Sequence, residues 1–122
     1  MRQAGKKAKV QISDLKLRTI IGTNAWERHT KQEIVINVIM EFDAAKAIST
    51  DNIKETVDYR TLTKKIIKKV ESSDFFLLEK LTDCVLNIVM ENLKIKWASV
   101  RIDKPRALRF ARSVSVELSA KR

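Results

Sequence analysis

The feature that most constrains the fold of this sequence is a run of alternating apolar residues at positions 33–42. The apolar positions of one set are Ile34, Ile36, Val38, Met40 and Phe42. Because successive side chains of a β-strand point to opposite faces, these five would share one face of a sheet. A similar alternation over residues 10–21 predicts a second long strand, with an irregularity near Ser13 and Asp14. We expect the two strands to pair as a hairpin.

Two amphipathic helices are predicted after this hairpin. The first covers residues 60–71 and follows Asp58, a residue type that caps helices well. Lysines form its outer face, which accounts for part of the basic charge without a ligand. The second helix is expected to start after Asp74, which could cap it, and its apolar residues recur at helical spacing to about residue 93.

Residues 96–104 and 113–119 alternate again and predict two further strands, whereas residues 44–59 are polar and mixed. The order ββααββ predicts an α+β fold, in which both helices pack on one face of a four-stranded antiparallel sheet. Several predicted strands carry apolar residues on both faces, and an unpaired edge of such a strand invites association. We therefore expect an oligomer that joins its sheets edge to edge into a ring.

With 122 residues, the chain is expected to form a single domain over residues 10–122, after a basic N-terminal tail at residues 1–9. Its net charge of +10 suits a phosphate-bearing ligand or a nucleic acid. Aromatic residues make up only 6% and are not interleaved with the basic ones, which disfavours nucleic-acid binding. The single cysteine, Cys84, predicts a reduced, cytoplasmic setting, and no segment has the apolar length of a signal peptide or a membrane span.

Lys104 is a candidate for proton transfer. It ends a predicted strand and precedes Pro105, the only proline, so its backbone has little freedom. Glu27, Tyr59 and Glu79 also lie at predicted ends of elements, where side chains can converge on a cleft.

Each of these residues also has a structural explanation. Glu27 could form a salt bridge with Arg28 in its loop, and Tyr59 could shield a helix start. Glu79 could stabilise a helix through its negative charge near the N-terminus. His29 has no partner at metal-ligand spacing. There is no glycine-rich phosphate loop, and no Ser/His/Asp set can be assembled.

A series of short motifs, in order and with compatible spacing, resembles the dihydroneopterin aldolase family and its close relative, dihydroneopterin triphosphate epimerase. The motifs are LRTIIG at 17–22, Trp26-Glu27-Arg28, Gln32 before EIVINV, Thr56-Val57-Asp58-Tyr59, Leu77-Leu78-Glu79-Lys80-Leu81, Asp103-Lys104-Pro105 and Ser113-Val114. The resemblance implies a tunnelling fold (T-fold), assembled as tetrameric rings that stack into a homo-octamer, with a pterin site between neighbouring subunits. It implies no metal and no organic cofactor, and no membrane or nucleic-acid partner.

The resemblance also implies roles for particular residues. Lys104 would transfer protons, Tyr59 from an adjacent subunit would assist at the substrate's hydroxyl groups, and Glu27 would orient the lysine. Glu79 would bind the pterin ring through paired hydrogen bonds, with backbone groups of Val57 and Leu78 as further contacts.

Two activities remain open within this resemblance. Trp26-Glu27 and Lys104-Pro105 are more similar to the aldolases, which cleave 7,8-dihydroneopterin into 6-hydroxymethyl-7,8-dihydropterin and glycolaldehyde in folate biosynthesis. Arg106, which stands where aldolases usually have glycine, and the following ALRFARSVSV are more similar to the triphosphate epimerases. The aldolase is the favoured interpretation at this point, with the 2′-epimerase as the alternative.

Overall fold

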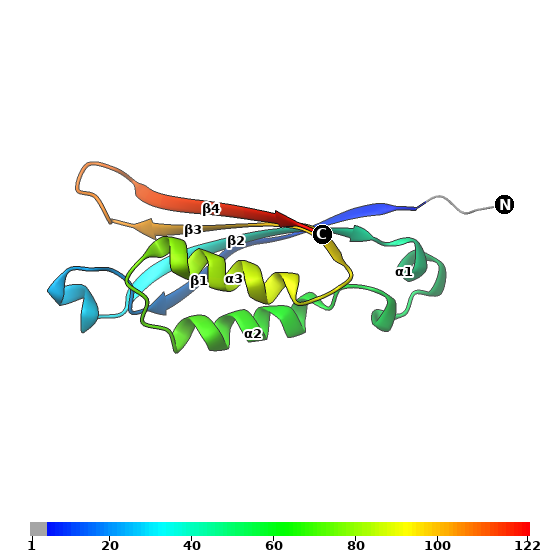
Figure 1. The fold of residues 1–122 in the computed structure, drawn as a ribbon, viewed down its shortest axis with the longest axis horizontal. Coiled ribbons are helices and arrows are strands. Elements are labelled where there is room, and N and C mark those ends of the chain that lie inside the picture. The colour runs from blue at the N-terminus through cyan, green and yellow to red at the C-terminus, as the bar shows by residue number, and fades with distance from the viewer. Residues whose placement is uncertain (1–4) are drawn as a thin grey trace.

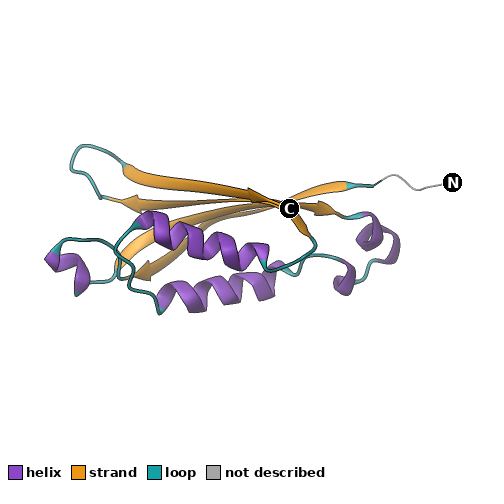
Figure 2. Ribbon diagram, viewed as in Figure 1, coloured by secondary structure: helices purple, strands orange, loops and turns teal. Residues whose placement is uncertain are grey.

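The computed structural model of the chain describes residues 5–122. Four strands and two long helices build the fold (Figures 1 and 2). They are β1 (Lys7–Thr19), β2 (Gln32–Asp43), α2 (Tyr59–Glu71), α3 (Leu78–Met90), β3 (Ile95–Pro105) and β4 (Ser113–Lys121). Three short elements, η1 (Ala25–Arg28), α1 (Ala45–Thr50) and η2 (Ile53–Glu55), lie in the connections.

The strands form one antiparallel sheet in the order β1-β2-β3-β4, and α2 and α3 lie against the same face of it (Figure 1). The predicted α+β fold is thus confirmed. The expected irregularity in β1 is a bulge between Ile12 and Leu15, where Asp14 takes the left-handed conformation with φ 55°. β1 starts at Lys7, earlier than expected, so the last residues of the predicted tail pair with β2. Residues 1–4 of that tail lie outside the described part.

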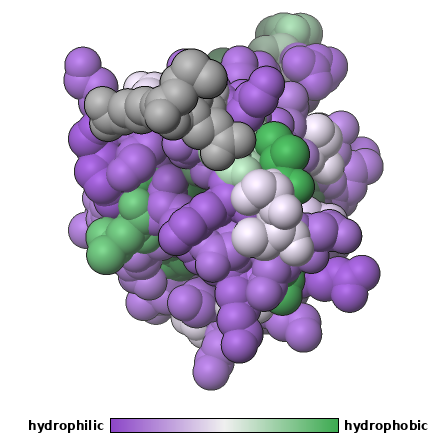
Figure 3. All heavy atoms as spheres, turned by 90° about the vertical axis from the view of Figure 1, so that its right-hand side faces the viewer, coloured by the Kyte–Doolittle hydropathy of each residue, from purple (hydrophilic) through white to green (hydrophobic). Residues whose placement is uncertain are grey.

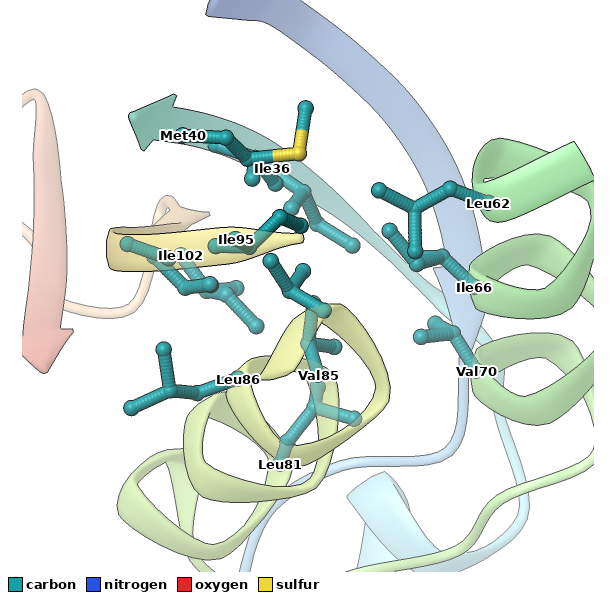
Figure 4. Close-up of a cluster of buried hydrophobic side chains, with 14 of the residues drawn as sticks. Ile36, Met40, Leu62, Ile66, Val70, Leu81, Val85, Leu86, Ile95 and Ile102 are labelled. Carbon is teal, nitrogen blue, oxygen red and sulfur yellow. The ribbon is translucent and has the colours of Figure 1, made fainter. Parts of the chain in front are cut away.

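The core lies between the sheet and the two helices. The alternating residues of β2 all point into it, from Ile34, which is fully buried, to Phe42, which is 5% exposed. Figure 4 shows how side chains from three directions meet there. They come from β2 and β3 (Ile36, Met40, Ile95, Ile102), from α2 (Leu62, Ile66, Val70) and from α3 (Leu81, Val85, Leu86). Burial of this apolar surface fixes both helices on the sheet.

The two helix starts differ from each other. Asp58 caps α2 as predicted, because its Oδ1 accepts hydrogen bonds from the amides of Arg60 and Thr61. The predicted cap at Asp74 is wrong: α3 begins at Leu78, and its N-cap residue, Leu77, makes no side-chain cap hydrogen bond. The polar segment after β2 also contains a short helix, α1, that the sequence pattern did not indicate.

The sheet ends on both sides in a long strand, since β1 and β4 are the edges. Each edge strand leaves backbone donors and acceptors without a partner within this chain. No helix of residues 5–122 combines the length and the apolar character needed to cross a membrane.

Candidate active site

An ion pair between Glu27 and Lys104 is the centre of the candidate site. Glu27 lies in η1, between β1 and β2, whereas Lys104 lies near the end of β3. The Nζ of Lys104 donates a hydrogen bond to Oε2 of Glu27. The exposed fractions of the two side chains are only 14% and 5%, so water screens the pair weakly.

Further donors surround the Glu27 carboxylate. Gln32 Nε2 donates to Oε2 at 2.9 Å, and the backbone amide of Asn24 donates to Oε1 at 3.1 Å. Burial alone would raise the pKa of Glu27, but the hydrogen bonds from Lys104, Gln32 and Asn24 and the charge of Lys104 outweigh it and lower the pKa to about 2. Glu27 is therefore a fixed anion, able to hold the Lys104 ammonium in one place.

Gly22 makes room for this carboxylate. Its φ of +128° is a conformation that residues with a side chain rarely adopt, and a Cβ at this position would overlap the carboxyl group of Glu27. Gln32 also donates to the carbonyl of Ile21, at 2.8 Å, and so connects the start of the loop to the same carboxylate. Gly22 and Gln32 appeared in the sequence motifs without a role, and the structure gives each a contact with Glu27.

Arg28 does not pair with Glu27. A salt bridge between these two residues was the structural explanation for Glu27 in the sequence. Its guanidinium donates instead to the backbone carbonyls of Gly22 and Phe75, both at 3.0 Å, and of Asp74. The same group lies over the ring of Phe76, 3.9 Å from the ring centre. Arg28 thus attaches the Glu27 loop to the segment that leads into α3.

The first turn of α3 therefore lies at the same end of the molecule as the ion pair (Figure 1). This turn carries Leu78, which is buried, and Glu79, which is exposed. Glu79 is the acidic residue of the helix N-terminus, where the helix dipole favours a carboxylate. Its exposure leaves the carboxylate available to a ligand.

Tyr59 and Val57 lie at the opposite end of the sheet. Lys94, just before β3, donates to the carbonyls of Lys54 and Thr56 at 2.7 and 3.3 Å, so the segment before α2 adjoins the start of β3. Lys104 lies ten residues further along this strand, about 30 Å away. Tyr59 is 55% exposed, whereas Val57 is buried. One chain therefore does not bring Tyr59 to Lys104.

Figure 3 views the molecule from this opposite end, whose surface is mostly hydrophilic with a few hydrophobic side chains. Ile48, Ile53 and Leu93 are exposed in the elements that surround it. At the Lys104 end, Trp26, Phe76 and Leu77 are exposed. Each end of a single chain thus presents apolar groups to its surroundings.

Basic residues of the β3–β4 connection follow Lys104 closely in the sequence. Arg106 follows Pro105 directly and has a positive φ of 64°, and Arg109 is exposed beside Phe110. Arg101 is engaged differently, since its Nε donates to Asp103 at 2.9 Å. Within residues 5–122, no three His, Cys, Asp or Glu side chains gather in a way that could hold a metal ion.

A family profile described as dihydroneopterin aldolase, FolB, matches residues 10–119. The chain belongs to the FolB family. The match covers every strand and both long helices except for the ends of β1 and β4. It confirms the family to which the sequence motifs pointed, and with it a pterin enzyme.

Two curated members of the family are similar to the chain over nearly its whole length. The dihydroneopterin triphosphate 2′-epimerase of Pseudomonas aeruginosa is 44% identical over 94% of both chains. That of Escherichia coli K12 is 47% identical over 93% of this chain and 94% of its own.

A crystal structure of E. coli dihydroneopterin aldolase in complex with neopterin has the same fold, with a TM-score of 0.87 over 93% of this chain and 98% of that one. Its sequence identity is 26%. The T-fold expected from the sequence is thereby confirmed. Between the two activities of the family, sequence identity favours the epimerases, which were the alternative rather than the favoured interpretation.

Proposed function

We propose that the chain is a dihydroneopterin triphosphate 2′-epimerase that works in the cytoplasm. The observation that carries this proposal is the 44–47% identity to two such epimerases over more than nine-tenths of each chain, against 26% to an aldolase of known structure. The epimerase thus replaces the aldolase, which the sequence motifs alone favoured, as the main interpretation. Aldol cleavage remains a second candidate, because the Glu27–Lys104 pair belongs to motifs that resemble the aldolases.

Both activities begin with the same step. A base removes the proton of the 2′-hydroxyl group, the C1′–C2′ bond breaks, and its electrons pass into the C6=N5 imine of the dihydropterin, where N5 takes up a proton. The ring itself accepts the electrons, so no Schiff base is needed. Epimerisation follows if the aldehyde fragment turns before the bond re-forms, because C1′ then adds to its other face. N5 loses its proton in this step, and the base returns a proton to the 2′-oxygen.

The residues at the Lys104 end supply the groups for this chemistry. Lys104 would exchange the proton with N5, and Glu27 would keep its ammonium aimed at the ring by the ion pair described above. Glu79, exposed at the start of α3, would accept two hydrogen bonds from the pterin's amino group and adjacent N–H. The carbonyl or amide of Leu78 is a further candidate contact in the same turn.

Tyr59 and Val57 would reach this site only from a neighbouring subunit, because they lie at the far end of their own chain. A ring that pairs β4 of one chain with β1 of the next would satisfy both sheet edges and place a neighbouring chain beside each site. We therefore propose a homo-oligomer of stacked tetrameric rings, with Tyr59 of one chain assisting at the substrate hydroxyls beside Lys104 of another.

The triphosphate of the substrate gives the basic residues near Lys104 a use. Arg106 and Arg109 lie in the connection that directly follows Pro105, and a guanidinium can bind phosphate oxygens through two hydrogen bonds. The net charge of +10 would also favour the approach of a polyanionic substrate.

Product analysis tests the proposal. The purified protein is incubated with 7,8-dihydroneopterin and, separately, with its triphosphate, and the products are resolved for inversion at C2′ and for release of the two-carbon aldehyde. We expect inversion of the triphosphate to dominate, with kcat/KM at least about tenfold higher than for the unphosphorylated pterin. Dominant glycolaldehyde release from dihydroneopterin would identify an aldolase instead, and turnover of neither compound would overturn both candidates.

A further inference from the structure

We propose that Arg28 is a positioning residue, which sets the separation between the Glu27–Lys104 pair and the first turn of α3. This inference rests on the proposed function, in which the pair acts on one side of the pterin and Glu79 binds the other. None of the chemistry above uses Arg28 itself.

The contacts of Arg28 join two segments that are far apart in the sequence. One acceptor, the carbonyl of Gly22, belongs to the Glu27 loop, and the other two, of Asp74 and Phe75, precede α3. Phe75 and Asp74 lie 47 and 46 residues from Arg28 along the chain. A planar guanidinium presents donors in fixed directions, so several bonds from one such group define both distance and angle between the segments.

The place of Arg28 in the sequence makes these contacts relevant to the site. It directly follows Glu27 in η1, and the carbonyls that it binds precede Glu79 by only a few residues. A second bond between the two segments, from the amide of Gly22 to the carbonyl of Phe75, is long at 3.4 Å. The guanidinium is therefore the stronger of these two connections between Glu27 and the start of α3.

Arg28 forms no ion pair with the described residues, since no carboxylate among them lies within ion-pair distance of it. Glu27, its immediate neighbour, instead accepts bonds from Lys104, Gln32 and Asn24. This division leaves Glu27 to hold Lys104 and leaves Arg28 to hold the loop.

A change in this separation would affect turnover more than binding. A misplacement of about 1 Å between reacting groups can reduce a rate about 100-fold. Ring binding through Glu79 needs only the first turn of α3, so the affinity for a pterin should change little when Arg28 is removed.

The test compares Arg28→Ala and Arg28→Lys with Arg18→Ala as a matched control. Arg18 also donates to a backbone carbonyl of the β1–β2 connection, that of Lys31, at 3.0 Å. This bond does not reach the segment before α3. For each protein, kcat with dihydroneopterin triphosphate and the dissociation constant of neopterin are measured, with and without millimolar guanidinium chloride.

For Arg28→Ala we expect kcat to fall at least about 30-fold while neopterin affinity stays within about threefold of the wild type. Guanidinium should restore part of the rate of this variant only, and Arg28→Lys should remain impaired because an ammonium lacks the planar set of donors. Arg18→Ala should keep its kcat within about threefold.

A wild-type kcat in Arg28→Ala, or an equal loss of kcat and of neopterin affinity without rescue, would overturn the positioning role. If the alanine variant does not fold, the lysine variant decides: a folded Arg28→Lys with wild-type kcat overturns the role, and a selective loss of kcat supports it. An inactive wild type would instead overturn the proposed function and this inference with it.

Discussion

The ammonium of Lys104 and the carboxylate of Glu27 form an ion pair although 77 positions separate them in the sequence. Both side chains are largely buried, so each charge depends on the other and on nearby polar groups for its solvation. Gln32 and the amide of Asn24 supply these groups on the carboxylate side. The pair can therefore serve both the stability of the loop and the orientation of the lysine.

Replacement of Lys104 by alanine should remove turnover and keep pterin binding. We expect kcat to fall about 100- to 10,000-fold, the usual loss for a proton-transfer group, while neopterin affinity changes less than about fivefold. The control is Lys96→Ala, an exposed lysine near the other end of the same strand. Steady-state kinetics and a neopterin titration check this, and a near-normal rate in Lys104→Ala would rule out the proposed role.

The low pKa of Glu27 predicts a contribution to stability that depends on pH. Its pKa is about 2 in the folded chain, below the value of about 4.3 for an unperturbed glutamate. The folded state thus favours the ionised form: the contribution, on the order of 3 kcal/mol, is fully present above pH 4.3 and is lost as the pH falls toward 2.

Urea unfolding at several values between pH 7 and pH 3 measures this effect as the difference between the wild type and Glu27→Gln. The difference should shrink below pH 4.3. Asp43, Asp58 and Asp103, whose pKa values are also lowered, are present in both proteins and cancel in it. A difference that stays constant from pH 7 to pH 3 would contradict the prediction.

Gly22→Ala should damage both the fold and the site. The added Cβ would overlap the Glu27 carboxyl group, and the φ of +128° would be strained. We expect a loss of roughly 1–3 kcal/mol in the free energy of unfolding, together with a fall in kcat, since the carboxylate must move to make room. Gly5→Ala is the control, because its Cβ would meet the nearest atom, Asp43 Oδ2, at 3.2 Å and without positive φ.

Glu79→Gln should chiefly weaken substrate binding. The neutral amide offers one oxygen where the carboxylate offers two, so neopterin affinity should fall at least about tenfold. Asp83→Asn, one turn further along α3, is the control and should keep its affinity. Unchanged binding in Glu79→Gln would remove this residue from the site.

Mixed assemblies can test the shared site. Lys104→Ala and Tyr59→Ala chains would each be inactive alone, but if the two groups come from different chains, about a quarter of the sites in a random mixture carry both intact. Co-expressed chains should therefore recover about a quarter of the wild-type activity. No recovery in a mixture shown to contain both chains would place the two groups in one chain or remove one of them.

The predictable part of this molecule is the part governed by local periodicity. The alternation of Ile34 to Phe42 indicates a buried face whatever the rest of the chain does, and Asp58 caps a helix through amides only two and three residues away. Asp74 is of the same residue type, but the backbone after it does not turn into a helix until Leu78. Residue type alone does not reveal that offset.

The site depends on contacts that no local pattern contains. The sequence singled out Glu27, Glu79 and Lys104, but the ion pair of Glu27 with Lys104 joins residues that are 77 positions apart. The carbonyls of Asp74 and Phe75 that hold Arg28 also come from a distant segment. The opposite positions of Tyr59 and Lys104 likewise follow from the direction in which each element crosses the sheet (Figure 1).

The anchoring of the Arg28 side chain has a consequence for the behaviour of the loop in acid. Backbone carbonyls do not titrate, so the acceptors that hold Arg28 are unchanged as the pH falls. Acid would therefore neutralise Glu27 and free the lysine while the loop stays docked on the segment before α3. Loss of activity at low pH would then be reversible, since neutralisation would come before the loop is released.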